Sequence, residues 1–191
     1  MAAVTENDIP IADPAPDGTC ISWDRTNPAT RHLVVVGRDA EARQDLLTRI
    51  LWLTSYTGNV IVDPSEPDNT ISAPELIRVA TDAPHPLIVF SDDRLLSQPA
   101  RNEQAASLTE CLYLLHCWGA SLVFLQSTPA LHLIPGPVLD ACVRIALATT
   151  THRDRAALFG TETGFPATTI TTPARSGIVA GLTPTPAAFT Y

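Results

Sequence analysis

The sequence predicts an α/β domain built on a mainly parallel sheet that helices cover on both faces. Three observations predict it: short, almost continuously apolar segments alternate with segments of helical periodicity, the apolar segments are rich in β-branched residues, and turn residues separate them. Strands with this composition are typical of sheets buried on both faces. With 191 residues, 45% of them hydrophobic, the chain suits one domain with a sizeable core.

The elements can be placed along the chain from their periodicity and from the turns between them. Apolar runs predict strands at residues 19–24, 32–37, 60–63, 86–93, 120–128, 143–150 and 176–182. Helical spacing predicts helices at residues 41–54, 73–83, about 100–118, 135–142 and 153–160. The apolar face of the first helix comprises Leu46, Leu47, Ile50, Leu51 and Trp52, and that of the third comprises Ala105, Leu108, Leu112, Tyr113 and Leu115.

The two ends of the chain differ in composition from the part between them. Residues 1–18 are acidic and Pro-rich, and we expect them to form an arm outside the domain. Residues 19–183 contain all the predicted strands and helices and are expected to form the domain itself. Residues 184–191 are interpreted as a C-terminal tail.

Charge and composition argue against several classes of function. The chain has 12 basic residues, all of them Arg, and a formal net charge of −8. Because binding to a nucleic-acid backbone depends on clustered cations, direct nucleic-acid binding is disfavoured. The apolar runs are too short to cross a bilayer, and the acidic N-terminus is unlike a signal peptide. We therefore expect a cytoplasmic protein with no membrane span.

The nucleophilic and metal-binding side chains form no recognisable site. Cys20, Cys111, Cys117 and Cys142 include no C-x-x-C pair, and no His has the spacing of a zinc site. We interpret the four cysteines as ordinary buried thiols in a reducing compartment. The chain also lacks a G-x-S-x-G sequence and a dinucleotide-binding glycine pattern. The sequence therefore predicts no metal site and no nucleophilic catalysis.

Residues 32–51 have the layout of a phosphate-binding loop: a buried strand, a glycine, a short gap and an amphipathic helix. The pattern for such a loop is G-x-x-x-x-G-K-[ST]. At its four defined positions the chain has Gly37, Ala42, Arg43 and Gln44. Only the first of these matches the pattern.

The order and spacing of the elements resemble the motor domain of the FtsK/SpoIIIE family, P-loop ATPases that include the EccC-like proteins. The similarity covers about residues 20–182, and it depends on the sequential order of its pieces. Four stretches carry it: ISWD with HLVVVG for the entry and P-loop strands, PLIVFSDD for the Walker B strand, CWGASLVFLQSTPALHLIPGPV for the family's Q-R-P segment, and VRIALATTTHRDRAALFG for its R-I…D…L-L-G segment.

The resemblance implies a RecA-like P-loop three-layer sandwich with a mainly parallel central sheet. It also implies phosphate-binding roles at positions where this chain departs from the family. Ala42 would crowd a backbone that curls around phosphate, Arg43 replaces the lysine, and Gln44 replaces the hydroxyl that binds magnesium. Asp39 and Glu41 add negative charge to a loop that would hold a polyanion.

Two further pairs stand at positions that contact the γ-phosphate and its metal in the family. Asp92 and Asp93 match the Walker B position and are interpreted as vestigial metal- and water-binding carboxylates; the alternative is that they begin a surface loop. Ser127 and Thr128 stand where the resemblance implies a polar pair that senses the γ-phosphate.

The resemblance also implies arginines at subunit interfaces, and Arg144 and Arg155 match these; surface ion pairs are the alternative. Because phosphoryl transfer depends on positioning and electrostatics, the substitutions together would remove most of the rate acceleration. We therefore expect a catalytically inactive pseudo-ATPase domain without a cofactor, with binding of ATP and magnesium disfavoured. It would act as a scaffold or regulatory interaction subunit of a DNA- or protein-translocating machine.

The partners expected for such a subunit are proteins: an active FtsK-like motor or further copies of this chain. Two alternatives stay open. One is an unconventional nucleotide-binding protein or weak ATPase that uses Arg43 with Asp92 and Asp93. The other is a protein that binds a small ligand or second messenger at the carboxyl ends of the strands, where ligands sit in open α/β sheets.

Overall fold

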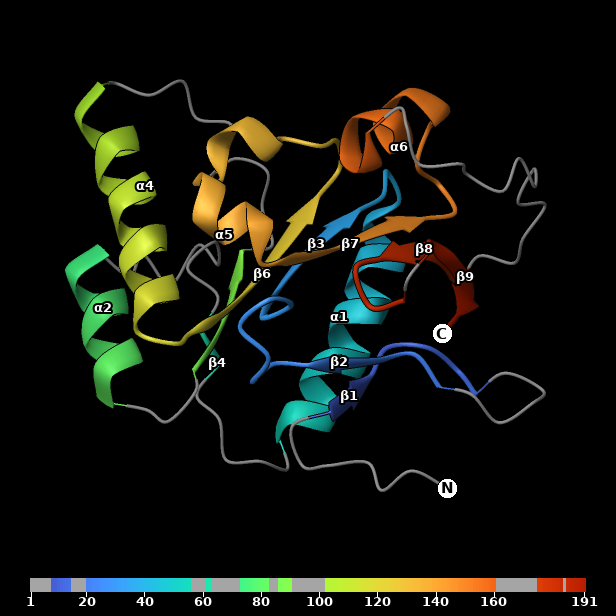
Figure 1. Ribbon diagram of the computed structural model, residues 1–191, viewed down its shortest axis with the longest axis horizontal. Helices are drawn as coiled ribbons and strands as arrows, with labels where there is room; N and C mark the ends of the chain where they lie inside the picture. The colour runs from blue at the N-terminus through green and yellow to red at the C-terminus, as the bar shows by residue number, and fades with distance from the viewer. Residues whose placement is uncertain are drawn as a thin grey trace.

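The computed structural model describes residues 8–14, 20–55, 61–62, 73–82, 86–90, 102–160, 175–183 and 185–191. Within these ranges the main sheet has the strand order β4-β5-β6-β3-β7-β8-β9 (Figure 1). Its strands are β3 (His32–Val36), β4 (Ile61–Val62), β5 (Leu87–Phe90), β6 (Ser121–Gln126), β7 (Cys142–Leu147), β8 (Ser176–Ala180) and β9 (Ala187–Thr190). The strands from β4 to β7 are parallel, whereas β8 and β9 are antiparallel additions at one edge. The mainly parallel sheet expected from the sequence is confirmed.

The helices cover both faces of this sheet. They are α1 (Ala40–Ser55), α2 (Ala73–Asp82), α4 (Asn102–Cys117), α5 (Gly136–Asp140) and α6 (His152–Phe159), with a 3-10 turn η1 at Leu131–Leu133. Residues on β3 alternate between two hydrophobic cores. Val34 and Val36 pack with side chains of α2, α4, α5 and α6, whereas Leu33 and Val35 pack with side chains of α1. Figure 1 shows α1 on the side of the sheet opposite to α5 and α6.

The described parts of the two end segments, residues 8–14 and 185–191, pack on the domain, which corrects the boundaries drawn from the sequence. In the segment assigned to an arm, β1 (Asp8–Pro10) pairs with β2 (Ser22–Asp24), and Ile9 and Ile11 are buried against α1. In the segment assigned to a tail, β9 extends the main sheet and buries Phe189. Single apolar residues among Pro and Asp, or Pro and Thr, gave too weak a periodic signal to predict either strand.

Three expectations about exposure were also wrong. Trp52 and Tyr113, both assigned to apolar helix faces, are 61% and 46% exposed. Tyr113 directly follows the buried Leu112, and Trp52 lies two residues after the buried Ile50, so the turn of about 100° per residue carries each side chain away from the core. Of the four cysteines, Cys20 and Cys117 are exposed, and only the other two are buried.

The amino-terminal end of β3 is fixed by a pair of histidines. His32 is fully buried, and its Nδ1 accepts a hydrogen bond of 3.1 Å from the backbone N–H of Leu122. Its Nε2 lies 2.8 Å from Nδ1 of His116 at the end of α4, so in the neutral pair the His32 Nε2–H donates. Burial, with the charges of His116 and Arg31, lowers the pKa of His32 to about 3. The contact therefore requires neutral rings.

Candidate functional site

The loop between β3 and α1 is shorter than the pattern of a phosphate-binding loop requires. β3 ends at Val36 and α1 begins at Ala40, which leaves three residues between them. Of the residues aligned with that pattern, 40–44 are helical, and the backbone N–H of Arg43 donates to the carbonyl of Asp39. A phosphate-binding loop holds its ligand with backbone N–H groups outside helical hydrogen bonding. Here most of that segment has become the first turn of α1.

Asp39 caps α1. Its Oδ1 accepts hydrogen bonds from the backbone N–H groups of Glu41 (2.9 Å) and Ala42 (3.4 Å). An aspartate in this position satisfies amides that have no partner inside the helix, and its charge interacts favourably with the helix dipole. These are the same amides and the same dipole that would attract an anion. The chain therefore supplies its own anion at the start of α1.

Gly37 is required by packing against the neighbouring strand. A β-carbon built at Gly37 would lie 2.9 Å from Cβ and 3.0 Å from Cδ1 of Leu147 on β7. Its backbone N–H donates to the carbonyl of Gln126, which continues the pairing of β3 with β6. The one position that matches the phosphate-binding pattern thus has a structural reason to be glycine that involves no ligand.

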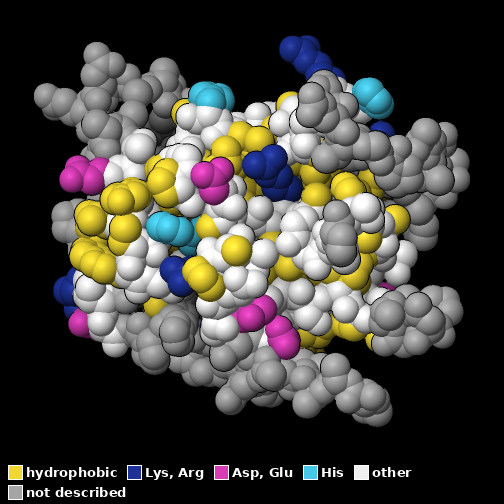
Figure 2. Space-filling view, in the orientation of Figure 1, with side chains coloured by type: hydrophobic (Ala, Val, Ile, Leu, Met, Phe, Trp, Pro, Cys, Tyr) yellow, Lys and Arg dark blue, Asp and Glu magenta, His cyan; other side chains and the backbone are white. Residues whose placement is uncertain are grey.

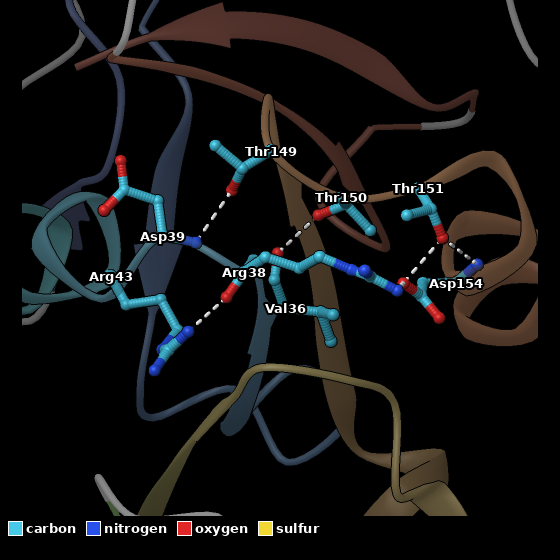
Figure 3. Close-up of polar contacts among 9 residues, drawn as sticks. Val36, Arg38, Asp39, Arg43, Thr149, Thr150, Thr151 and Asp154 are labelled. Atoms are coloured by element: carbon cyan, nitrogen blue, oxygen red, sulfur yellow. Dashed lines mark hydrogen bonds and ion pairs between the residues drawn. The ribbon is translucent and has the colours of Figure 1, made fainter.

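Arg43, which stands at the lysine position, donates from its guanidinium to the carbonyl oxygen of Gly37 (Figure 3). Its side chain therefore bends back along the loop and binds the backbone. On the same turn, the hydroxyl of Tyr191 donates to the carbonyl of Ala42 at 3.0 Å, and Ala42 is itself buried. Gln44 is exposed on α1. The C-terminal residue thus packs on the first turn of α1, which sequence reasoning missed.

The loop after β7 contains three consecutive threonines, Thr149–Thr151, which we call the threonine clasp. Two of them bond the end of β3 and the loop that follows it. The hydroxyl of Thr150, a buried residue, donates to the carbonyl of Val36 at 2.8 Å. The hydroxyl of Thr149 accepts from the backbone N–H of Asp39 at 3.2 Å. Figure 3 shows both contacts beside the start of α1. Hydrogen bonds within the chain thus hold the end of β3 and the start of α1 together.

The third threonine belongs to a polar cluster at the start of α6. Thr151 is the N-cap of α6, where its hydroxyl accepts from the backbone N–H of Asp154 and donates to that residue's Oδ2 at 2.6 Å. The guanidinium of Arg38 reaches the same carboxylate at 3.3 Å. The Thr151 hydrogen bond, more than Arg38, lowers the pKa of Asp154. The spacing of Thr151 and Asp154 is a capping signal visible in the sequence, but nothing local indicated its link to Arg38.

The strand β6 ends beside this loop, as expected from the sequence. Gln126 is fully buried, and its Oε1 accepts from the backbone N–H of Ala130 at 2.9 Å. Its side-chain Nε2 is buried without a hydrogen-bond partner. Ser127 and Thr128, the sensor-like pair, follow directly, half-buried and exposed respectively. Gln126 was not among the predicted site residues, although its position at a strand end could have indicated it.

Of the remaining predicted residues, the structure places only Arg144 and Arg155. Asp92 and Asp93 lie outside the described residues. Arg144 pairs across the sheet with Val34, which lies two residues, or about 7 Å, before the end of β3. Its guanidinium donates to the carbonyl of Leu158 at 3.1 Å, and its role at a subunit interface stays a prediction. Arg155 is half-buried on α6.

Among the described residues, no group of three or more His, Cys, Asp or Glu side chains could hold a metal ion. In the same part of the chain, no helix is long and apolar enough to cross a membrane.

No protein-family model matches the chain, and no curated protein matches it. Solved structures do match it in fold. The cytoplasmic domain of the type VII secretion ATPase EccC from Thermomonospora curvata matches with a TM-score of 0.64 and 13% identity, covering 100% of this chain and 29% of that chain. ATPases 2 and 3 of EssC from Geobacillus thermodenitrificans match with a TM-score of 0.69 and 11% identity, covering 100% and 42%. The pCW3 conjugation coupling protein TcpA, as a monomer with ATPγS, matches with a TM-score of 0.64 and 12% identity, covering 97% and 66%.

At these identities the likeness shows the fold. The chain has the α/β architecture of P-loop ATPase domains, with a mostly parallel central sheet. It spans less than half the length of the EccC and EssC chains and about two thirds of the TcpA chain. The fold class expected from the sequence is confirmed.

Proposed function

We propose that this domain is a non-hydrolysing FtsK/SpoIIIE-like domain that acts as a scaffold or regulatory interaction subunit of a DNA- or protein-translocating machine. The observation that carries the proposal is the carboxylate of Asp39 on the amides of Glu41 and Ala42. A polyphosphate at the start of α1 would have to displace this carboxylate and would meet its negative charge. The chain contains no lysine to compensate.

The threonine clasp supports the same proposal. An enzyme that opens and closes around a nucleotide needs a loop that can rearrange at low cost. Here Thr150 bonds the end of β3 and Thr149 bonds the loop itself. Ligand binding would have to break these contacts as well as remove the Asp39 cap.

The kind of machine is proposed from the structures of similar fold. They include a type VII secretion ATPase and a conjugation coupling protein, and the EssC structure comprises ATPases 2 and 3 of that protein. A domain that keeps this fold without turnover can serve beside active domains through its surfaces. Its partner in this proposal is an active FtsK-like motor subunit.

Isothermal titration with ATP and magnesium tests the loss of nucleotide binding. We expect no saturable heat from the natural chain at ATP concentrations up to about 1 mM, the upper end of the usual range of KM values. We expect the same result from a variant that restores the phosphate-binding pattern, Ala42→Gly with Arg43→Lys and Gln44→Thr. In that variant Asp39 and the threonine clasp remain in place.

Asp39→Asn is the informative companion, because asparagine also caps helices but carries no charge. Saturable binding by the natural chain would contradict the proposal and favour an unconventional nucleotide site that uses Arg43. If only the pattern-restoring variant binds ATP, then the natural side chains of Ala42, Arg43 and Gln44 exclude the nucleotide, and the capped loop does not. Mass photometry with candidate motor subunits tests the interaction role, and no association with any of them would count against it.

A further inference from the structure

A cleft separate from the strand-end loop opens on the face of the sheet that carries α5 and α6. It has a volume of about 270 Å³ and is lined by Cys142, Arg144, Phe159, Ala180 and Gly181. Figure 2 shows the molecule in the orientation of Figure 1, with hydrophobic side chains distributed over this view and few basic ones among them. The lining combines apolar side chains with one guanidinium.

Within the described part of the chain, the guanidinium of Arg144 has N–H donors at this cleft that form no hydrogen bond. Its guanidinium gives one hydrogen bond to the carbonyl of Leu158, at 3.1 Å, and its side chain is half-buried. In the part of the chain that the structure describes, no carboxylate lies within ion-pair distance of Arg144, whereas Arg38, Arg49, Arg78 and Arg175 each have one. A guanidinium carries several N–H donors in a planar fork that matches a carboxylate. The unused part of the fork therefore selects for an oxyanion.

The walls of the cleft decide which oxyanion fits. Phe159 is almost fully buried, and Ala180 and Cys142 present apolar surface. Burial raises the pKa of the Cys142 thiol to about 12, so this thiol stays neutral and takes no part in nucleophilic chemistry. A single cation with apolar walls suits a carboxylate that carries an apolar stem. Phosphate backbones bind to clustered cations, which this cleft lacks.

The volume of the cleft favours an inserted side chain over a free ligand. Pockets for small molecules and cofactors measure roughly 300–1,000 Å³ and converge several polar groups on the ligand. This cleft is smaller and supplies one charged group. It has the size of a socket for one inserted side chain, of the kind that anchors protein interfaces.

We propose that the Arg144 cleft is a docking socket for an acidic side chain, flanked by an apolar residue, on a partner polypeptide. This rests on the proposed function as an interaction subunit and specifies the chemistry of the partner. Arg144 pairs with the partner carboxylate through the free side of its fork. Phe159 and Ala180 pack against the flanking apolar residue.

The test is a nuclear magnetic resonance titration of the full ¹⁵N-labelled chain, read at the amides of Ala180 and Gly181. The probes are the peptide acetyl-Ala-Phe-Glu-Ala-amide and its Gln counterpart, which differ by one charge. We expect the Glu peptide to bind about tenfold more tightly, since a charge-assisted hydrogen bond is lost in the Gln peptide. We expect Arg144→Gln to abolish this preference, Arg144→Lys to reduce it, and Arg153→Gln, at an exposed position of α6, to leave it unchanged.

Three outcomes would overturn the proposal: equal binding of the two peptides, no shift at these amides, or a preference that survives Arg144→Gln. A fourth uses 3-phenylpropionate as a free carboxylate. Binding of this acid without binding of the Glu peptide would make the cleft a small-molecule site and overturn the docking role. Thermal unfolding of each variant checks that the fold is intact.

The same variants separate this inference from the proposed function. If the motor subunit binds the natural chain and the peptides show no charge preference, the socket fails and the interaction role stands. If the peptides show the preference and no motor subunit binds, the interaction role fails and the socket stands as a carboxylate site. If both hold, we expect Arg144→Gln to weaken association with the motor by about the same factor as it weakens binding of the Glu peptide.

Discussion

The two ends of the central strand β3 are fixed by opposite kinds of chemistry. At the carboxyl end, the side chain of Asp39 caps α1, and Asp154, whose pKa is lowered, pairs with the guanidinium of Arg38. At the amino end, His32 and His116 must both be neutral, because the His32 ring already accepts from Leu122 and donates to its partner. One end thus depends on charge and the other on its absence.

The difference shows which end is arranged as a site. A ligand can use groups that are charged and near the surface, and the carboxyl end has these, but the chain itself already pairs them. At the amino end, His32 is buried, and the half-buried Arg31 beside it donates to the carbonyl of His116 at 3.1 Å. The function of the amino end is structural, since it connects the end of α4 to the middle of the sheet.

A pH series should distinguish the two ends and give the largest effect. Because the folded pKa of His32 is about 3 and its ordinary value is 6.5, the unfolded chain binds more protons below pH 6.5. The stability supplied by neutral His32 is therefore complete above pH 6.5 and is lost as the pH falls toward 3. We expect the free energy of unfolding, from urea titrations, to drop by about 2 kcal/mol between pH 6.5 and pH 5.

Two variants sharpen this result. His32→Gln should lower stability at neutral pH and flatten the pH dependence above pH 4 by about one proton. His132→Gln, at an exposed position, should leave the slope unchanged. The lowered pKa of Asp154 acts in a different window, below its ordinary value of 3.8, so a loss that begins only there would show that the histidines contribute nothing.

Gly37→Ala should disturb the carboxyl end of β3 by steric overlap. Its β-carbon would lie 2.9 Å from Cβ of Leu147, and overpacking of this kind costs about 1–3 kcal/mol. Gly136→Ala is the matched control, because nothing lies within 4 Å of its added β-carbon. Urea midpoints of the two variants measure the difference. Equal midpoints would mean that packing against Leu147 does not require a glycine at position 37.

Thr150→Val should have the smallest effect of the three, about 1–2 kcal/mol, by leaving the buried carbonyl of Val36 without its donor. The companion Thr149→Val removes an acceptor at an exposed position, where water can replace it, and should cost less. Denaturant unfolding at pH 7 measures both. A larger loss of stability from Thr149→Val would mean that the hydrogen bond to the loop contributes more to stability than the hydrogen bond to the end of β3.

Much of the fold was predictable, because its determinants are local. The five parallel strands could be predicted from their near-continuous apolar runs, because this composition is typical of strands buried on both faces. The strands β1 and β9 were missed because each has few inward-facing residues, and their burial depends on α1 and β8 being present first. The exposure of Trp52 and Tyr113 was misjudged for a similar reason: a helix shows its apolar residues in the sequence, but the sheet selects which of them it covers.

For the candidate site, the sequence by itself determined which residues depart from a phosphate-binding pattern and that no lysine is available to hold a phosphate. Only the tertiary structure decided that Asp39 caps α1, that Thr149 and Thr150 bind the preceding loop, and that Arg144 keeps spare donors in a cleft. The physical reason is separation along the chain. More than 100 residues divide Asp39 from Thr149, so no local pattern contains their contact; the order of strands in the sheet brings them together.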